Sequence, residues 1–165
     1  MKTWTKRPKE EAYLLNPAFC STTLTATIVG YSSVNDAGLP FPLVFSVLPI
    51  VLHKPTRESL PPNTRTSMAA WLQGNSFARV LFYERLISLK PYTWEAVHFG
   101  ILYDWIAPKS GGLLETTINE SDMGRIERSH AAEARECLMR AHFLGKWFAK
   151  AGAVQTVMAL WGVRP

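Results

Sequence analysis

The sequence is poor in cysteine, and its two cysteines, Cys20 and Cys137, lie far apart with no Cys-x-x-Cys pair. Such a spacing supports neither a disulfide framework nor a zinc-binding motif. The opening residues MKTWTKRPKEEAY also lack the apolar segment that follows the basic start of a secretory signal. We therefore expect a reduced, cytoplasmic protein, in which both thiols lie in apolar surroundings with raised pKa values.

Charged residues are also scarce, at 19% of the chain against 47% hydrophobic residues. This balance excludes a disordered chain and leaves few charges to cover a free surface, so we expect some apolar surface to meet a partner. Between Ala12 and Leu52 the only charge is Asp36, but serines, threonines and prolines interrupt the stretch. A bilayer span needs about 20 consecutive apolar residues. The stretch is therefore predicted to be a buried core segment, with no contact to a membrane.

The sequence contains none of the motifs that mark the common enzyme classes. It has no glycine-rich phosphate loop, no G-x-G-x-x-G and no paired carboxylates in an apolar setting. His130 with Glu133, and Cys137 with His142, come nearest to a metal-ligand spacing, yet neither pair has a second pair nearby. His98 falls on the apolar face of a predicted helix, where we interpret it as a core histidine. We expect no catalytic residue, no metal and no cofactor.

Prolines, glycines and capping residues divide the chain into helical segments of ordinary length. We predict one compact, mainly α-helical domain over residues 1–165, with a small β-hairpin turned at Gly111–Gly112 before the β-prone run Leu113–Ile118. Three helices followed by this hairpin, over residues 64–118, give the element order of a winged-helix-like unit. The predicted helices cover residues 16–33, 39–53, 66–73, 75–89, 92–107, 129–151 and 153–161, and Pro91 separates the fourth from the fifth.

Positive charge is the feature that points to nucleic acid. A formal charge of +5 and a pI near 9.4 permit contact with nucleic acid or with an acidic protein surface. However, the helix predicted over residues 92–107, which would read DNA in a winged helix, contains no Lys or Arg and carries Glu95 and Asp104. We therefore favour a solvated face or a dock for an acidic partner over DNA binding. The candidate nucleic-acid contacts are Lys6, Arg7, Lys9, Lys109, Lys146 and Lys150.

Four strings of the sequence, taken together with their spacing, carry a family resemblance. They are EAYLLNPAFC, LPIVLHKPTRESLP, RTSMAAWLQGN and FLGKWFAKAGAVQTVMALWGVRP. From about Trp4 to Pro165 the chain resembles the middle component family of three-component ABC-type ATPase systems. The resemblance implies a small helical, winged-helix-like accessory subunit that brings no catalytic residues of its own.

The resemblance also implies partners. It implies two partners, an SMC/Rad50-like ABC ATPase that senses foreign DNA and an effector that is often a nuclease. The middle component joins the effector to the ATPase. Such sets resemble Lamassu-type bacterial defence against phage and plasmids. Two alternatives stay open: a stand-alone winged-helix DNA-binding protein, and an enzyme with a site assembled from scattered residues. The candidates for fold or interface within the four strings are Arg57, Arg65, Trp71, Trp147, Trp161 and Arg164.

Overall fold

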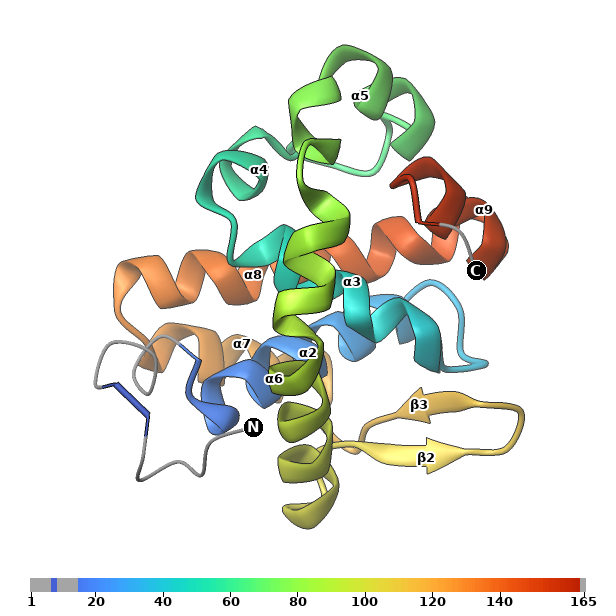
Figure 1. Cartoon of the computed structure of the whole chain (residues 1–165). Helices are drawn as coiled ribbons and strands as arrows, with labels where there is room; N and C mark the ends of the chain where they lie inside the picture. The colour runs from blue at the N-terminus through green and yellow to red at the C-terminus, as the bar shows by residue number, and fades with distance from the viewer. Residues whose placement is uncertain (1–6, 9–14, 164–165) are drawn as a thin grey trace.

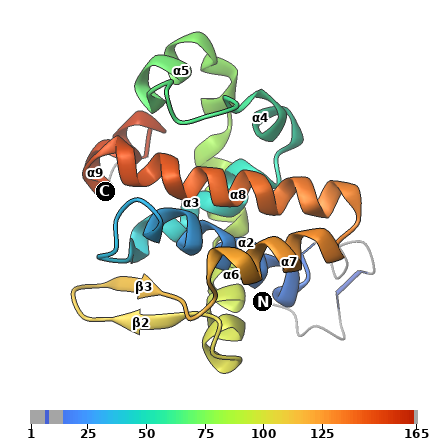
Figure 2. The same ribbon diagram turned by 180° about the vertical axis from the view of Figure 1, so that it is seen from behind.

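The computed structural model describes residues 7–8 and 15–163 of the chain. Within these residues the protein is mainly helical with a small antiparallel sheet, as the sequence predicts. Helix α6 crosses one side of the molecule, α7 and α8 cover the other, and α2 lies between them (Figure 1; from behind in Figure 2). The described elements are α2 (Pro17–Ser32), β1 (Leu39–Pro40), η2 (Phe41–Leu43), α3 (Val44–Val51), α4 (Lys54–Ser59), α5 (Met68–Gly74), η3 (Ser76–Arg79), α6 (Phe82–Leu102), β2 (Ala107–Lys109), β3 (Leu113–Glu115), α7 (Glu120–Ser129), α8 (Ala132–Ala151) and α9 (Val154–Leu160).

Helix α2 is buried around its whole circumference from Cys20 to Tyr31. Its start is fixed by the Asn16 side chain, which accepts a hydrogen bond from the Ala18 N–H at 2.9 Å, and by Pro17 at the first helical position. Three of its four threonines tolerate this burial because their hydroxyls donate to the carbonyl four residues earlier. These bonds join Thr22 to Ala18 (2.8 Å), Thr23 to Phe19 (2.9 Å) and Thr27 to Thr23 (3.2 Å).

Two glycines let α2 and α8 cross at close range. A Cβ on Gly30 of α2 would overlap the backbone carbonyl of His142, and a Cβ on Gly145 of α8 would overlap that of Thr27. Helix α3, which is apolar throughout except for the buried Ser46, packs against α2, α6 and α8. The core of the protein is therefore built on the α2–α8 crossing, with α3 filling the space beside it.

The predicted hairpin is confirmed, and the structure adds a third strand to it. Strand β3 pairs antiparallel with β2, and the order of the sheet is β1-β3-β2. Leu39 of β1 lies opposite Leu114 of β3, both buried, so the sheet closes over one end of the core. Strand β1, which completes the sheet, lies outside residues 64–118. The winged-helix-like unit predicted over residues 64–118 therefore does not contain the whole sheet, and it stays a prediction.

The structure corrects the predicted break at Pro91. Helix α6 runs without interruption through Pro91, although the sequence prediction ends one helix before this residue and begins another after it. Pro91 lies on the exposed side of the helix, where water can reach the carbonyl that loses its usual partner. The start of α6 was also predicted too early, because residues 76–79 form a 3-10 turn first.

Two further segments differ from the prediction. The prediction misses α7, whose start is fixed by Asn119, since its side chain accepts from the Asp122 N–H at 2.9 Å. The long helix predicted from Ser129 begins instead at Ala132, after a turn that separates it from α7. Residues 39–53, predicted as one bent helix, divide into β1, a 3-10 turn and the short helix α3.

Candidate functional site

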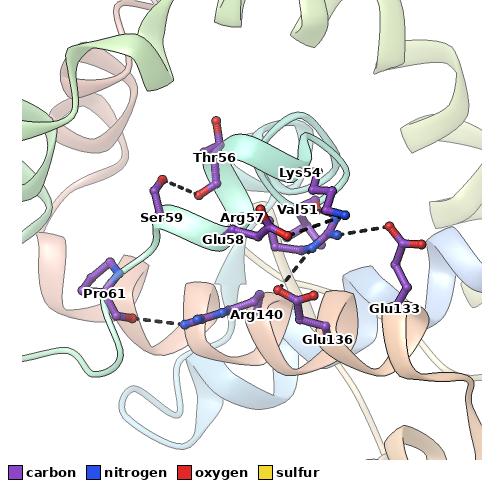
Figure 3. Close-up of polar contacts among 10 residues, drawn as sticks. All are labelled: Val51, Lys54, Thr56, Arg57, Glu58, Ser59, Pro61, Glu133, Glu136 and Arg140. Atoms are coloured by element: carbon purple, nitrogen blue, oxygen red, sulfur yellow. Dashed lines mark hydrogen bonds and ion pairs between the residues drawn. The ribbon is translucent and has the colours of Figure 1, made fainter.

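Arg57 lies on α4 with its side chain buried and connects three parts of the chain (Figure 3). Its Nη1 donates to the Val51 carbonyl at the end of α3 at 3.0 Å. Its Nη2 lies 3.4 Å from Glu133 and its Nε 3.6 Å from Glu136, both on α8. A guanidinium can make these contacts at once because its donors form a rigid fork. Arg57 thus holds the α3–α4 turn against α8.

The three tryptophans among the candidate interface residues lie together in the core. Trp71, Trp147 and Trp161 are 6%, 1% and 1% exposed. The ring centres of Trp71 and Trp147 are 5.5 Å apart, and Phe82 packs on Trp161 at 4.7 Å. These rings join α5, α8, the end of α9 and the start of α6. A partner could contact them only after this packing is disrupted, so an interface role for them stays a prediction.

The loop between α4 and α5 is tied to α8 by side chains from the helix. Each donor reaches across from α8 to a backbone or side-chain oxygen of residues 61–66, so basic groups of α8 take part in holding the loop. Arg65, in the same loop, is exposed. The bonds join Arg140 to the Pro61 carbonyl (3.3 Å), the Trp147 indole to the Thr66 carbonyl (2.8 Å) and Lys150 to the Thr64 hydroxyl (2.8 Å).

Most candidate nucleic-acid contacts that the structure describes are paired with carboxylates. Arg7 lies 2.8 Å from Glu95 of α6, and its guanidinium sits over the Tyr92 ring. Lys109 pairs with Glu115 across the hairpin at 3.5 Å. Phosphate binding would have to compete with these pairs. Lys146 pairs with Glu120 at 3.4 Å, and Lys150 bonds to Thr64 in the loop described above. The other two candidate nucleic-acid contacts, Lys6 and Lys9, lie outside the described residues, as does the candidate interface residue Arg164.

Glu120 joins α7 to α8 through two basic side chains. It lies 3.0 Å from His142 Nε2 and 3.4 Å from Lys146 Nζ. Partial burial by itself raises the pKa of the Glu120 carboxyl, but His142 and Lys146 outweigh that effect and lower it below the ordinary value. The positive charge of this part of α8 is therefore used to hold α7 in place.

The chemistry of the two cysteines follows their burial, as expected from the sequence. Burial, followed by the charge of Glu95, raises the pKa of the Cys20 thiol to about 12. Burial also raises the pKa of Cys137. Neither thiol is poised to act as a nucleophile, because the reactive form is the thiolate.

Over residues 7–8 and 15–163, no three His, Cys, Asp or Glu side chains are grouped so that they could hold a metal ion.

The feature that the sequence prediction missed is a stripe of large apolar side chains along the outer face of α6. The spacing of these residues places them on one side of the helix, away from the buried side. His98 also lies on this face, exposed and stacked on Trp94 at 5.7 Å, so its interpretation as a core histidine is wrong. The stripe consists of Tyr83 (55% exposed), Ile87 (48%), Trp94 (40%) and Ile101 (38%).

Comparison with known proteins gives one match, which covers almost the whole chain. The family described as ABC-three component (ABC-3C) system Middle Component 3 matches residues 4–165. The chain belongs to this family. No curated protein and no solved structure matches it.

Membership of the Middle Component 3 family confirms the resemblance at the level of ABC-3C systems. A Middle Component 3 chain is one component of a multi-subunit system, which implies that it has protein partners. Among the residues that the structure describes, none of the helices is long and apolar enough to cross a membrane.

Proposed function

We propose that this Middle Component 3 chain is a non-enzymatic accessory subunit that links an SMC/Rad50-like ABC ATPase to an effector, a nuclease, in a Lamassu-type bacterial complex against phage and plasmids. The observation that carries the proposal is the exposed apolar stripe of α6. Large contiguous apolar surfaces on a folded chain are typical of protein interaction sites. The stripe runs nearly the length of α6, roughly 27 Å from Tyr83 to Ile101 at 1.5 Å per residue, with the exposed Lys90 between Ile87 and Trp94.

The arrangement of the elements supports a winged-helix origin for this surface. The order α2, β1, α3, α6, β2, β3, with strand order β1-β3-β2, resembles that of a winged helix if α4 and α5 are taken as insertions before the last helix; such a unit would span residues 17–115 and not the predicted 64–118. Helix α6 then takes the place of the helix that reads DNA in such proteins. In this chain the same face carries apolar side chains, which suits a partner protein.

The proposal that the chain is non-enzymatic is supported by its cysteines. Both thiols have raised pKa values, which keeps them protonated and poorly nucleophilic. Both are free and buried, in keeping with the reducing bacterial cytoplasm in which the proposal places the complex.

The alternative is a stand-alone DNA-binding protein, and α6 does not favour it. From Pro91 to Leu102 the helix has no Lys or Arg, and Glu95 on its flank is held by Arg7. Lys90 is the single exposed cation on the outer face of this helix. A helix that enters a DNA groove gains most of its affinity from cations near the phosphates.

The proposal is tested by co-expressing the chain with the ATPase and the effector encoded beside it. We expect all three to purify together and to elute as one complex in size-exclusion chromatography. The purified complex should lose the chain when Ile87→Glu is introduced, because a carboxylate would have to be desolvated on the docking face. The matched control is Met139→Glu on α8, since Met139 is 54% exposed on a different helix.

Two results would contradict the proposal. One is a wild-type chain that purifies away from both co-expressed proteins. The other is an isolated chain that binds double-stranded DNA on its own, with an affinity that falls steeply as salt rises, because this behaviour indicates direct phosphate contact. If the Ile87→Glu chain folds and still assembles with both partners, the linking role would stand, but the outer face of α6 would not be the surface that binds them.

A further inference from the structure

Two segments that meet at one end of the molecule contain no Asp or Glu side chain. Neither the segment from Ser59 to Tyr83 nor the segment from Cys137 to Val163 contains Asp or Glu. The structure brings the two segments together, because α5 packs against α9 and the Trp71 ring packs against Trp147. In Figure 1, α8 crosses the middle of the molecule, and α5 and α9 form its end above and to the right. We call this the basic end.

The basic end has cations without acidic partners. Arg65 and Arg79 are exposed, and within residues 7–8 and 15–163 neither guanidinium forms an ion pair with a carboxylate. Lys150 is exposed too, and among the residues that the structure describes its ammonium group bonds to the neutral Thr64 hydroxyl and to no carboxylate. This differs from Lys146, one turn earlier on α8, which is paired with Glu120. Charges of one sign without internal compensation produce a field that attracts an oppositely charged partner.

Two hollows lie beside the contact between α5 and α9, and both combine apolar lining with these cations. The larger, of about 600 Å³, is lined by Leu72 and Leu160 together with Arg79 and Gln155. The smaller, of about 270 Å³, shares Leu160 and has Arg65 and Lys150 in its lining. An apolar hollow with cations on both sides matches a helix or strand that presents apolar side chains flanked by carboxylates.

We propose that the basic end binds an acidic, amphipathic segment of a partner protein, with apolar side chains in the hollow between α5 and α9 and carboxylates near Arg79 on one side and Arg65 and Lys150 on the other. The inference rests on the proposed function, because it requires protein partners. It adds a second docking surface, centred on the hollows beside α9, which adjoins the stripe of α6 at Tyr83. Two surfaces of different chemistry would let one subunit hold two partners.

Other occupants fit this end less well. A second copy of the chain would bring two carboxylate-free surfaces of the same sign together, which is unfavourable. Single-stranded nucleic acid is bound by cations combined with exposed aromatic faces on which bases stack. The exposed aromatic rings of this end, Phe77 (43% exposed) and Tyr83 (55%), are not among the residues that line the two hollows, so the hollows themselves offer no such stacking face.

The test uses the complete chain and overlapping 15-residue peptides that span the co-encoded ATPase and effector. Fluorescence anisotropy would measure the binding of each labelled peptide. We expect the tightest peptides to be rich in Asp and Glu with interspersed apolar residues, and their affinity to fall as salt rises. Arg79→Glu should weaken that binding at least about tenfold, because it turns an attraction into a repulsion across the hollow.

A second variant tests the hollow without changing its charge. Thr156→Trp would fill the space between α5 and α9, since Thr156 is exposed and lines both hollows. We expect Thr156→Trp to weaken the binding of the same peptides as strongly as Arg79→Glu does. The matched controls are Lys54→Glu and Met139→Trp, which change exposed residues outside both hollows. Both controls should leave peptide affinity within about twofold, and a thermal melt would verify that all four variants fold.

The outcomes separate this inference from the proposed function. Tight peptides without acidic residues, or affinities that neither Arg79→Glu nor Thr156→Trp changes, would overturn the inference while the three-protein complex still forms. A different outcome is that the wild-type chain binds a labelled oligo-dT, and that the two variants lose that binding while their binding of the peptides is unchanged. This result would assign the basic end to nucleic acid and would also overturn the inference. Failure of the wild-type chain to assemble with either co-encoded protein would remove the proposed function, and this inference with it.

Discussion

Gly145 of α8 lies directly against the backbone carbonyl of Thr27 on α2, and no side chain fits between them. The reciprocal contact, between Gly30 of α2 and the carbonyl of His142, lies on the same face of the crossing. The two helices therefore meet backbone to backbone. Because this crossing organises the core, the separation of α2 and α8 controls the stability of the whole domain.

Gly145→Ala should destabilise the protein by about 2–4 kcal/mol, because the added methyl group would push two buried helices apart. Chemical denaturation followed by circular dichroism would measure the loss. The control is Gly124→Ala on α7, where a Cβ would meet only the flexible end of the Arg128 side chain. That change should be neutral or stabilising by up to about 1 kcal/mol, because alanine favours the helix. Equal effects of both substitutions would refute a tight crossing.

Arg57→Ala should cost about 2 kcal/mol of unfolding free energy, because it leaves the buried Val51 carbonyl without its donor. The loss stays moderate because Glu133, one of the two carboxylates that Arg57 pairs with, has a side chain that is 74% exposed and can be solvated again. Lys54→Ala on the same helix is the control and should change stability by less than about 0.5 kcal/mol. If Arg57→Ala instead kept full stability and lost a partner, Arg57 would serve an interface.

Glu120→Gln should lower stability at neutral pH and make no difference in acid. The folded protein holds the Glu120 pKa below its ordinary value of 4.5, because His142 and Lys146 outweigh the opposing effect of burial. Unfolded chains therefore bind the proton more readily, and the stabilisation is complete above about pH 5 and disappears as the pH falls through the lowered pKa. The effect should be less than about 1 kcal/mol, because the carboxylate is partly exposed.

The measurement is the difference in unfolding free energy between wild type and Glu120→Gln at about pH 7 and about pH 3. Glu58→Gln is the control, since Glu58 pairs with Lys54 on an exposed surface. We expect Glu58→Gln to change stability little at either pH. A wild-type advantage that grew toward low pH would contradict the sign given for Glu120.

Leu81→Gly should leave stability unchanged or raise it by up to about 1 kcal/mol. Leu81 has φ 54° and is 62% exposed, so it adopts a left-handed conformation without gaining much burial. Arg85 holds this corner by donating to the Val80 carbonyl at 2.8 Å and to the Ala78 carbonyl at 3.0 Å. Glycine adopts the left-handed conformation without strain.

Val80→Gly is the matched control for the corner, because Val80 is equally exposed but has φ −62°. This substitution relieves no strain and should cost about 0.5–1 kcal/mol through backbone entropy. Thermal unfolding of both variants would give the comparison. A Leu81→Gly protein that is less stable than Val80→Gly would show that the Leu81 side chain contributes more by contact than its conformation costs.

Local patterns were enough to predict much of the fold. Asn16 and Pro17 fix the start of α2, and the Gly-Gly turn predicted the hairpin, because capping and turn chemistry act over a few residues. The same local rules failed at Pro91. A proline within a helix leaves one carbonyl without its donor, and the cost depends on whether that side of the helix faces water, as it does at Pro91.

Local sequence patterns could not predict the exposed apolar stripe of α6. Trp71 and Trp94 are both aromatic residues in apolar helices, yet one is 6% exposed and the other 40%. Helix α6 has apolar residues on both sides, so its periodicity could not indicate which side was buried. Only the position of α2 and α3 behind it decided that Trp94 and Ile87 face outward.

The sequence alone determined the helical class of the protein, its scarcity of acidic residues near the C-terminus and its membership of the Middle Component 3 family. These properties depend on composition, local spacing and the order of residues along the chain. The tertiary structure decided which basic residues are paired, as Lys146 is with Glu120, and which have no carboxylate partner among the described residues, as is the case for Arg79. Ion pairs and exposed faces depend on contacts between segments far apart in the sequence, and only the folded chain brings those segments together.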